Sequence, residues 1–324
     1  MFLNFRLTLV LICILVLSAS NAQAQLHGYK WGLTPFYGAH NPALDKLNDK
    51  ALKAPLVGRG TVRGEPGTPD EAFSTQVPFG FSNPLSKTGV DANVGLELEW
   101  FQTLRHSFFM GVSTYESSID GNSVPGSLPL QGVLRDVTYD RRVDLSYNEF
   151  YFGWKYKIFH RPKKYRFYSR LSLNEVFDLD YREEHVFSIH SDDTSVDSLD
   201  GVKRIISVRG QTTGVLMFQF GLGGEYFLKK NISVGLEGSY IVAGRSFQFV
   251  DTDKKDDLQN GDDVTINPPV LPADDNAPLG YIPPDTDPNT DWSQTELPGN
   301  AGSVVDMDLR LDGWKAAFRI TIYF

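Results

Sequence analysis

Two stretches of the sequence contain residue types whose spacing could carry chemistry. In 188–193 (SIHSDD), Ser188, His190 and Asp192 offer the nucleophile, base and carboxylate of a hydrolase. A working triad requires the fold to bring these groups together, and closeness along the chain does not show that. We therefore predict no catalytic residue, while an enzyme built on His190 and a nearby serine stays an alternative.

The second stretch is acidic, 251–263 (DTDKKDDLQNGDD). A calcium loop of the EF-hand kind that starts at Asp251 would need an oxygen ligand at Lys255 and a glycine at Asp256, and neither position fits. Weak divalent binding by the clustered carboxylates stays open, but a solvated, flexible acidic loop is the interpretation we favour. The stretch 264–298 follows with eight prolines, which favour an extended loop. We predict no metal site and no cofactor.

The charge of the chain excludes one class of partner. Its 324 residues include 31 Lys and Arg against 40 Asp and Glu, a net charge of −9. A nucleic-acid-binding protein needs clustered basic side chains for the phosphates, so we expect no nucleic-acid partner. Residues 251–300 alone contain twelve acids and two lysines, so the acidity belongs mainly to one segment.

Residues 1–24 are predicted to be a secretory signal peptide. Arg6 supplies the positive charge, Leu7 to Leu17 the apolar segment, and Ala22-Gln23-Ala24 a cleavage site. A retained membrane anchor is the alternative. The single cysteine, Cys13, lies in this segment, so residues 25–324 contain no cysteine that could form a disulfide.

The remaining sequence alternates with period two. In 94–101 (VGLELEWF), Val94, Leu96, Leu98 and Trp100 fall on one face, while two glutamates fall on the other. Such alternation is typical of β-strands, whose successive side chains point to opposite faces. The predicted strands are 26–37, 93–101, 107–117, 143–159, 165–177, 211–228, 231–243 and 305–324.

Short and long connections alternate between these strands. The short ones are 102–106, 160–164 and 229–231, and the long ones lie at about 38–92, 118–142, 178–210 and 245–304. This pattern predicts a closed, antiparallel, up-and-down transmembrane barrel with periplasmic turns and extracellular loops. Eight strands fit best, and ten is the alternative if 55–92 adds a hairpin. In the first long loop, Asn41-Pro42 before ALDKLNDKALKA predicts a short amphipathic helix, either on the barrel rim or partly inside its mouth.

The last strand, 314–324 (WKAAFRITIYF), carries a resemblance. An amphipathic terminal strand that ends on Phe324 resembles the signal read by the barrel-assembly machinery. The chain as a whole is similar to the small bacterial outer-membrane β-barrels of the OmpA/OmpX type, within the broad porin-like class, without a periplasmic peptidoglycan-binding domain. The resemblance implies a Gram-negative outer membrane, contact with its lipid bilayer and lipopolysaccharide, and loops that could bind an extracellular ligand.

In a barrel that crosses lipid, the apolar face must point outward and the polar face into the lumen. An eight-stranded barrel has room only for its own side chains, and a lone buried ion costs several kcal/mol. We therefore predict a lumen charge network that blocks the barrel, although some of its members could instead be solvated at the rims. Its predicted members are Glu97, Glu99, Glu149, Lys155, Lys157, Arg166, Arg170, Glu225, Glu237, Lys315 and Arg319.

This lumen leads to three functional hypotheses. The first is a non-enzymatic outer-membrane barrel with a structural or surface-interaction role. A small channel for ions or small solutes is the alternative, favoured by ten or more strands. A lipid-modifying enzyme, known among small barrels of this kind, is the third.

Overall fold

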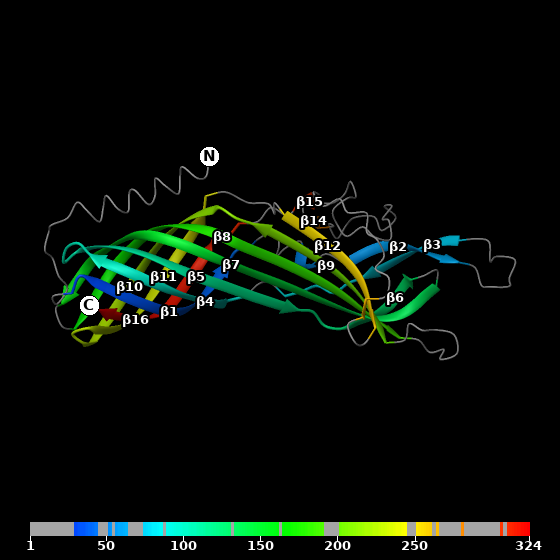
Figure 1. Cartoon of the computed structure of the whole chain (residues 1–324), viewed down its shortest axis with the longest axis horizontal. Helices are drawn as coiled ribbons and strands as arrows, with labels where there is room; N and C mark the ends of the chain where they lie inside the picture. Colours follow the sequence, from blue (N-terminus) through cyan, green and yellow to red (C-terminus); the bar gives the residue numbers. More distant parts are fainter. Residues whose placement is uncertain are drawn as a thin grey trace.

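Eight antiparallel strands close into a ring in the computed structural model of the chain (Figure 1). The structure describes residues 29–44, 51–53, 56–63, 74–86, 89–130, 133–161, 164–190, 201–244, 251–260, 264–265, 280–281, 305–306 and 310–324, so the predicted signal peptide lies outside it. The ring strands are β1 (Trp31–Pro42), β4 (Asp91–Phe101), β5 (His106–Asp120), β7 (Val133–Arg161), β8 (Tyr165–His190), β10 (Val215–Lys229), β11 (Ile232–Ala243) and β16 (Gly313–Tyr323).

The order around the ring is β8-β10-β11-β16-β1-β4-β5-β7, and β7 pairs with β8 to close it. At the seam between the chain ends, β1 pairs with β16 from Gly32↔Tyr323 to Pro42↔Gly313. The eight-stranded prediction is thus confirmed. The alternative of ten is wrong, because β2 (Leu56–Arg63) and β3 (Ser74–Phe81) pair only with each other, in a separate two-stranded sheet. Among the described residues, no helix is long and apolar enough to cross a bilayer.

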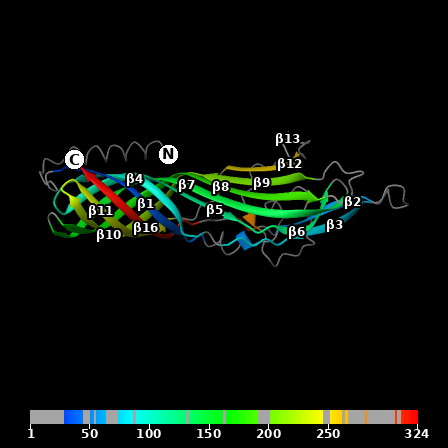
Figure 2. The same cartoon turned by 90° about the horizontal axis from the view of Figure 1, so that it is seen from below.

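Two of the ring strands are much longer than a membrane crossing requires. β7 has 29 residues and β8 has 26, whereas a tilted strand crosses with about 9–11. Beyond the ring, β6 (Val124–Leu130) pairs with β7, and β9 (Val202–Thr212) pairs with β8. β12 (Asp251–Asn260) pairs with β9 and β13 (Val264–Thr265) with β12. We call this part, with the outer halves of β7 and β8, the extension (Figure 2).

The polarity of the wall inverts where the extension begins. On β7, Phe150 and Phe152 point outward while Glu149 is buried; farther along, Val143 and Leu145 are buried and Arg142 is exposed. An apolar outer face with a polar interior suits a wall surrounded by lipid, and a polar outer face with an apolar interior suits a wall surrounded by water. The inversion therefore marks one edge of the membrane-spanning belt.

A β-bulge accompanies the inversion. Glu149 pairs with Val176 and Asn148 with Asp178, so Phe177 is an extra residue on β8. Since a one-residue shift exchanges the two faces of a strand, even-numbered residues of β8 face inward before Phe177 and odd-numbered ones after it. The neighbouring strand breaks at the same level between β9 and β10, where Gly214 has φ +78° and its N–H bonds to the Val176 carbonyl.

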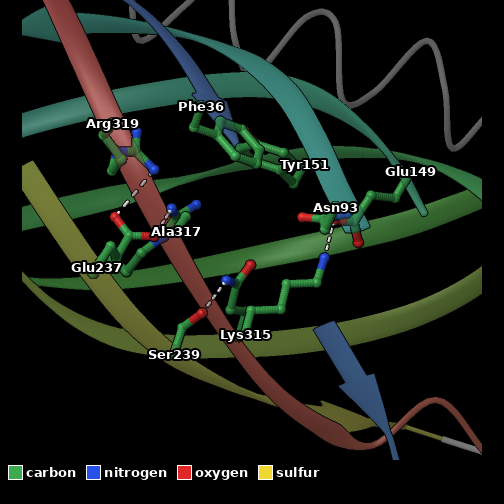
Figure 3. A pocket seen from close by; sticks show the side chains of 11 residues that line it. Phe36, Asn93, Glu149, Tyr151, Glu237, Ser239, Lys315, Ala317 and Arg319 are labelled. Atoms are coloured by element: carbon green, nitrogen blue, oxygen red, sulfur yellow. Dashed lines mark hydrogen bonds and ion pairs between the residues drawn. The ribbon is translucent and has the colours of Figure 1, made fainter. Parts of the chain in front are cut away.

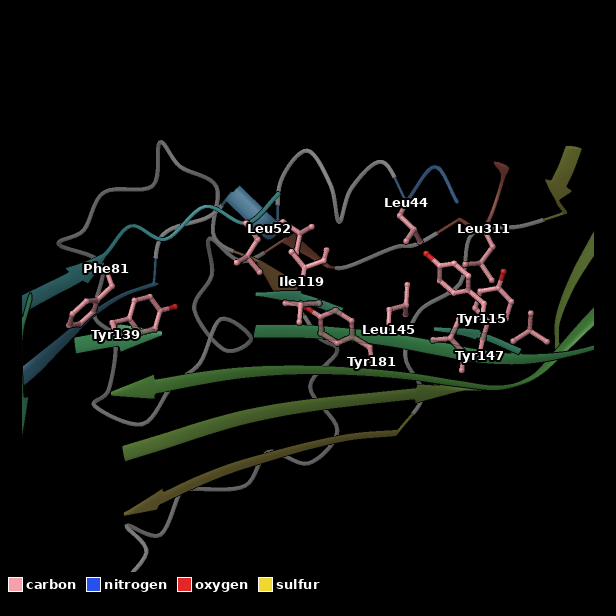
Figure 4. Packing of buried hydrophobic residues seen from close by; sticks show 14 of the residues in the cluster. Leu44, Leu52, Phe81, Tyr115, Ile119, Tyr139, Leu145, Tyr147, Tyr181 and Leu311 are labelled. Carbon is pink, nitrogen blue, oxygen red and sulfur yellow. The ribbon is translucent and has the colours of Figure 1, made fainter. Parts of the chain in front are cut away.

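The inner face of the extension packs into an apolar core (Figure 4). Leu44, Leu52 and Leu311, from connecting segments, are fully buried in this core. Phe81, at the end of β3, packs against Tyr139 and Phe187, with ring centroids 5.0 and 5.2 Å apart. The segments that leave the membrane-spanning ring are thereby folded onto the extension.

Several sequence predictions need correction. The expected loops 118–142 and 178–210 are mostly strand, because the outer halves of β7 and β8 continue their alternation with a polar outer face. The expected flexible acidic loop is β12 over 251–260, because its backbone pairs with β9. The first strand is Trp31–Pro42 rather than 26–37, so Asn41 and Pro42 end a strand rather than begin a helix. A 3-10 turn, η1 (Ala51–Lys53), is the described part of that predicted helix, whose residues 45–50 lie outside the described chain.

The end of the chain differs from its prediction in one respect. The expected strand 305–324 is divided: β15 (Val305–Asp306) pairs with β14 (Gly280–Tyr281), and β16 begins only at Gly313. Gly313 lies so close to β1 that an added Cβ would be 2.1 Å from the Asn41 carbonyl oxygen. Glycine is therefore required where β16 enters the ring.

Candidate functional site

The lumen of the ring holds all eleven members of the lumen charge network as buried side chains. Ten of them form ion pairs with one another, in three tiers along the barrel axis. The tiers follow from strand position: the first lies near the short turns, the third near the polarity inversion.

The first tier consists of two glutamates and two cations. The Lys155 ammonium lies 3.0 Å from Glu99 Oε2, and Arg166 Nη2 lies 3.3 Å from the same oxygen. Arg166 also donates two hydrogen bonds to Glu225, from Nε at 2.7 Å and from Nη2 at 2.9 Å. Ser107 donates a further bond of 2.6 Å to Glu99. Each carboxylate thus meets at least one cation in the absence of bulk water, as a buried ion requires.

The second tier joins strands on different sides of the ring. Glu97 on β4 pairs with Arg319 on β16 and, at 3.4 Å, with Arg170 on β8. Glu237 on β11 pairs with both arginines, at 3.2 Å from Arg319 Nη1, and accepts a 2.9 Å bond from the Tyr168 hydroxyl. Two acids and two bases therefore form a closed square across the lumen.

The third tier is a single pair, Lys315 with Glu149 (Figure 3). Ser113 and Asn174 donate to Glu149 at 2.6 and 3.2 Å. A cavity of about 20 Å³ lies beside this pair, and Tyr151 is among its lining residues. That volume is about the size of one water molecule.

Lys157 is the eleventh member and differs from the others. It is 2% exposed, and within the described part of the chain its ammonium has no hydrogen-bond partner. It lies 4.3 Å from the centroid of the Phe101 ring, a cation–π contact. The lumen charge network contains five acids and six bases, and Lys157 is its cation in excess.

An aromatic layer lies beneath the first tier, near the short turns. Phe101, Phe227 and Tyr323 are buried and pack together, with centroids 5.5 and 5.7 Å from Tyr323 to the two phenylalanines. The sequence pattern alone did not single out these rings or Tyr168, although each has the parity of the charged residues on its strand. The lumen is thus filled successively by the aromatic layer, the three tiers and the apolar core of the extension.

A second polar cluster lies in the extension, outside the membrane-spanning belt. Arg141 Nη2 lies 2.6 Å from Glu183 Oε1, which is 3.4 Å from His185 Nε2. Burial lowers the pKa of His185 to about 4, against the attraction of Glu183. Burial alone would raise the pKa of Glu183, but the positive charge of Arg141 brings it below its usual value. The cluster therefore holds a neutral imidazole beside an intact Arg–Glu pair.

The candidate catalytic residue His190 lies far from the edge of the membrane-spanning belt. His190 ends β8 opposite Asp136, thirteen residues along β7 from the inversion at Glu149, which is roughly 40 Å at about 3.3 Å per residue. Its Nε2 forms a 2.7 Å hydrogen bond with the Thr138 hydroxyl, and Asp192 lies outside the described residues. In the described part of the chain, no group of three or more His, Cys, Asp or Glu side chains is placed to hold a metal ion.

Comparison with known proteins returns structures rather than sequences. No family model and no curated relative matches the chain. Among solved structures, the outer membrane protein OprG from Pseudomonas aeruginosa is 10% identical, with 93% of this chain and 99% of that chain covered and a TM-score of 0.35. A Pseudomonas aeruginosa FadL homologue is 9% identical (91% and 89% covered, TM-score 0.19), and a bacterial polysaccharide outer membrane secretin is 10% identical (93% and 100% covered, TM-score 0.16).

The architecture itself identifies the class of protein. A closed antiparallel ring, an apolar outer belt and a polar interior are together the construction of a transmembrane β-barrel. The chain folds as an eight-stranded transmembrane β-barrel whose lumen, in the described part of the chain, is filled by side chains.

Proposed function

We propose that the protein is a non-conducting, non-enzymatic barrel of a Gram-negative outer membrane, and that its extension is a surface for interaction outside the cell. The observation that carries this proposal is the filling of the lumen along its length, from the aromatic layer through the lumen charge network to the apolar core. A solute would have to displace paired, buried ions, and each broken pair costs several kcal/mol.

The extension supports the interaction role. Its solvent-facing side carries charged pairs such as Arg209 with Asp180, at 2.8 and 2.9 Å, and Arg182 with Glu184. Ordered strands fix these groups in place, and fixed polar groups suit recognition better than mobile ones, because less conformational entropy is lost on binding. The partners proposed for the rest of the chain are the bilayer with its lipopolysaccharide, and the barrel-assembly machinery through Phe324.

Single-channel recording tests the filled lumen. The full-length mature chain, inserted into a planar bilayer, is expected to give no discrete current steps. Reproducible steps that vanish when the protein is omitted would overturn the proposal in favour of the channel alternative. An epitope placed in 191–200 and detected on intact cells tests the orientation; detection only after the outer membrane is opened would contradict an external extension.

The enzyme alternative has a direct test as well. Purified protein in mixed micelles is expected to leave labelled phospholipid and lipopolysaccharide unchanged. Turnover that is lost in His190→Ala would restore the enzyme hypothesis.

A further inference from the structure

The end of the barrel opposite the extension carries an exposed set of cations, which we call the basic rim. Lys30 precedes β1, Arg105 lies in the β4–β5 turn, Lys164 in the β7–β8 turn, and Lys229 and Lys230 at the β10–β11 turn. All five residues are exposed, and none makes an ion pair with another described residue. The described turns at this end contain no acidic residue. The rim is therefore a region of excess positive charge among the described residues.

Several exposed cations at the other end of the molecule, by contrast, are paired with acids. On the outer face of the extension, Arg142 pairs with Asp144 at 3.0 Å, and its neighbours are likewise matched with acids. The nearest described acids below the rim, Glu99 and Glu225, are buried and already bound to Lys155 and Arg166. An excess of exposed cations attracts an external anion.

The position of the rim identifies that anion. Each cation lies at the margin of the apolar belt: Leu104 beside Arg105 is 54% exposed, and Leu228 beside Lys229 is 59% exposed. At the same level, Trp31 and Trp100 lie 6.4 Å apart, and Trp154 donates a 3.1 Å hydrogen bond to His106. Tryptophans prefer the depth of the lipid headgroups. The phosphates of the adjoining leaflet lie at this depth.

We propose that the basic rim is a binding surface for the headgroups of anionic phospholipids in the leaflet on its side, which selects them over zwitterionic lipids. This rests on the proposed function, since it requires the barrel to span a membrane. The occupant is lipid phosphate rather than free phosphate, because exposed apolar side chains flank the cations where acyl chains would lie. A juxtamembrane cation typically gains about 1 kcal/mol near an anionic surface, equivalent to roughly a fivefold preference.

Brominated lipids test the selection, because they quench nearby tryptophans. The full-length mature chain is inserted into vesicles of phosphatidylcholine with and without phosphatidylglycerol, and quenching of Trp31, Trp100 and Trp154 is compared for each lipid in brominated form. Brominated phosphatidylglycerol is expected to quench the tryptophan fluorescence more strongly than its mole fraction in the vesicle would predict for a random distribution of lipids. Lys229→Gln/Lys230→Gln should lower this preference by up to about 25-fold, roughly fivefold for each of the two cations removed. The matched control, Arg182→Gln/Lys203→Gln, removes two exposed cations of the extension and should leave the preference unchanged.

The outcomes separate the two proposals. Equal quenching by both lipids in a correctly inserted barrel would overturn the basic rim as a lipid-selective surface and leave the proposed function intact. Failure of even brominated phosphatidylcholine to quench would overturn the membrane-spanning function, and this inference with it. A preference abolished by inorganic phosphate at constant ionic strength would reveal a free-phosphate site and overturn the lipid assignment.

Discussion

Lys315 on β16 and Glu149 on β7 form an ion pair across the full width of the barrel. The two strands lie four positions apart in either direction around the eight-stranded ring, so they are diametrically opposed. No bond along the wall brings these residues together; the small diameter of the barrel does. The pair therefore spans the lumen and links the two halves of the ring.

Removal of Lys315 should destabilise the barrel strongly. Lys315→Met leaves Glu149 buried with only Ser113 and Asn174 as donors, and an orphaned buried charge typically costs about 3–5 kcal/mol. Urea unfolding in detergent micelles, followed by tryptophan fluorescence, measures the change. Lys229→Met, at an exposed lysine, serves as the control and should unfold like the unaltered protein. Equal stability of both variants would contradict a structural role for the pair.

The double variant Lys315→Met/Glu149→Leu should recover most of this loss. Replacement of a complete buried ion pair by apolar side chains is often neutral, because the desolvation cost disappears with the attraction. The same urea titration tests it. A double variant as unstable as Lys315→Met alone would place the instability in packing rather than in charge. A large apolar residue at Arg319 alone, or at Glu97 alone, should instead lower thermal stability. Each of these side chains is bound to two or more partners, so its removal leaves buried charges without their counter-ion.

The aromatic layer and the lumen charge network should act as independent barriers. Phe101→Ala/Phe227→Ala/Tyr323→Ala opens the layer near the short turns and removes the 2.7 Å hydrogen bond from the Tyr323 hydroxyl to Glu225, but it leaves the ion pairs of the three tiers and the apolar core in place. Planar-bilayer recording of this variant is therefore expected to show no discrete current steps. Current steps in the variant, with none in the unaltered protein, would show that the aromatic layer alone seals the barrel.

Acid should weaken the extension through His185. Its pKa is about 4 in the folded protein, below the ordinary 6.5, so folding favours the neutral ring. The neutral ring therefore adds about 3 kcal/mol to the free energy of unfolding. This stabilisation is fully present above pH 6.5, declines below it as the unfolded state gains a proton, and is lost by about pH 4. Glu183, Arg141 and Tyr139 face the ring, and the lowered pKa of Glu183 acts in the same direction.

Hydrogen exchange between pH 7 and pH 4, corrected for the intrinsic rate, measures this effect in β7 and β8. His185→Gln keeps a group that can bond the Tyr139 hydroxyl but does not titrate, so it should show a smaller loss of protection over the range. An identical pH profile in the variant would exclude His185 as the source.

The sequence predicts the membrane-spanning part well and the extension poorly, for a physical reason. In 94–101 and 314–324, one face must meet lipid, so apolar residues and charges separate cleanly. In 178–190 the inner face includes Glu183 and His185, while the outer face is polar for water, which leaves little contrast between them. Inward charges could be assigned from parity, but their partners depend on ring closure, which sets Lys315 opposite Glu149.

Phe177 tests whether the bulge is a single extra residue at the boundary between belt and extension. Its deletion would join Val176 directly to Asp178, and because these two already pair with neighbouring residues of β7, Leu179 and Tyr181 would still face the core. Limited proteolysis should therefore find the extension as resistant as in the unaltered protein. Phe177→Ser keeps the bulge and serves as the control, because Phe177 itself is 43% exposed. Cleavage of the extension in the deletion variant but not in Phe177→Ser would contradict this expectation and show that the bulge itself holds the extension in place, since only the deletion removes it.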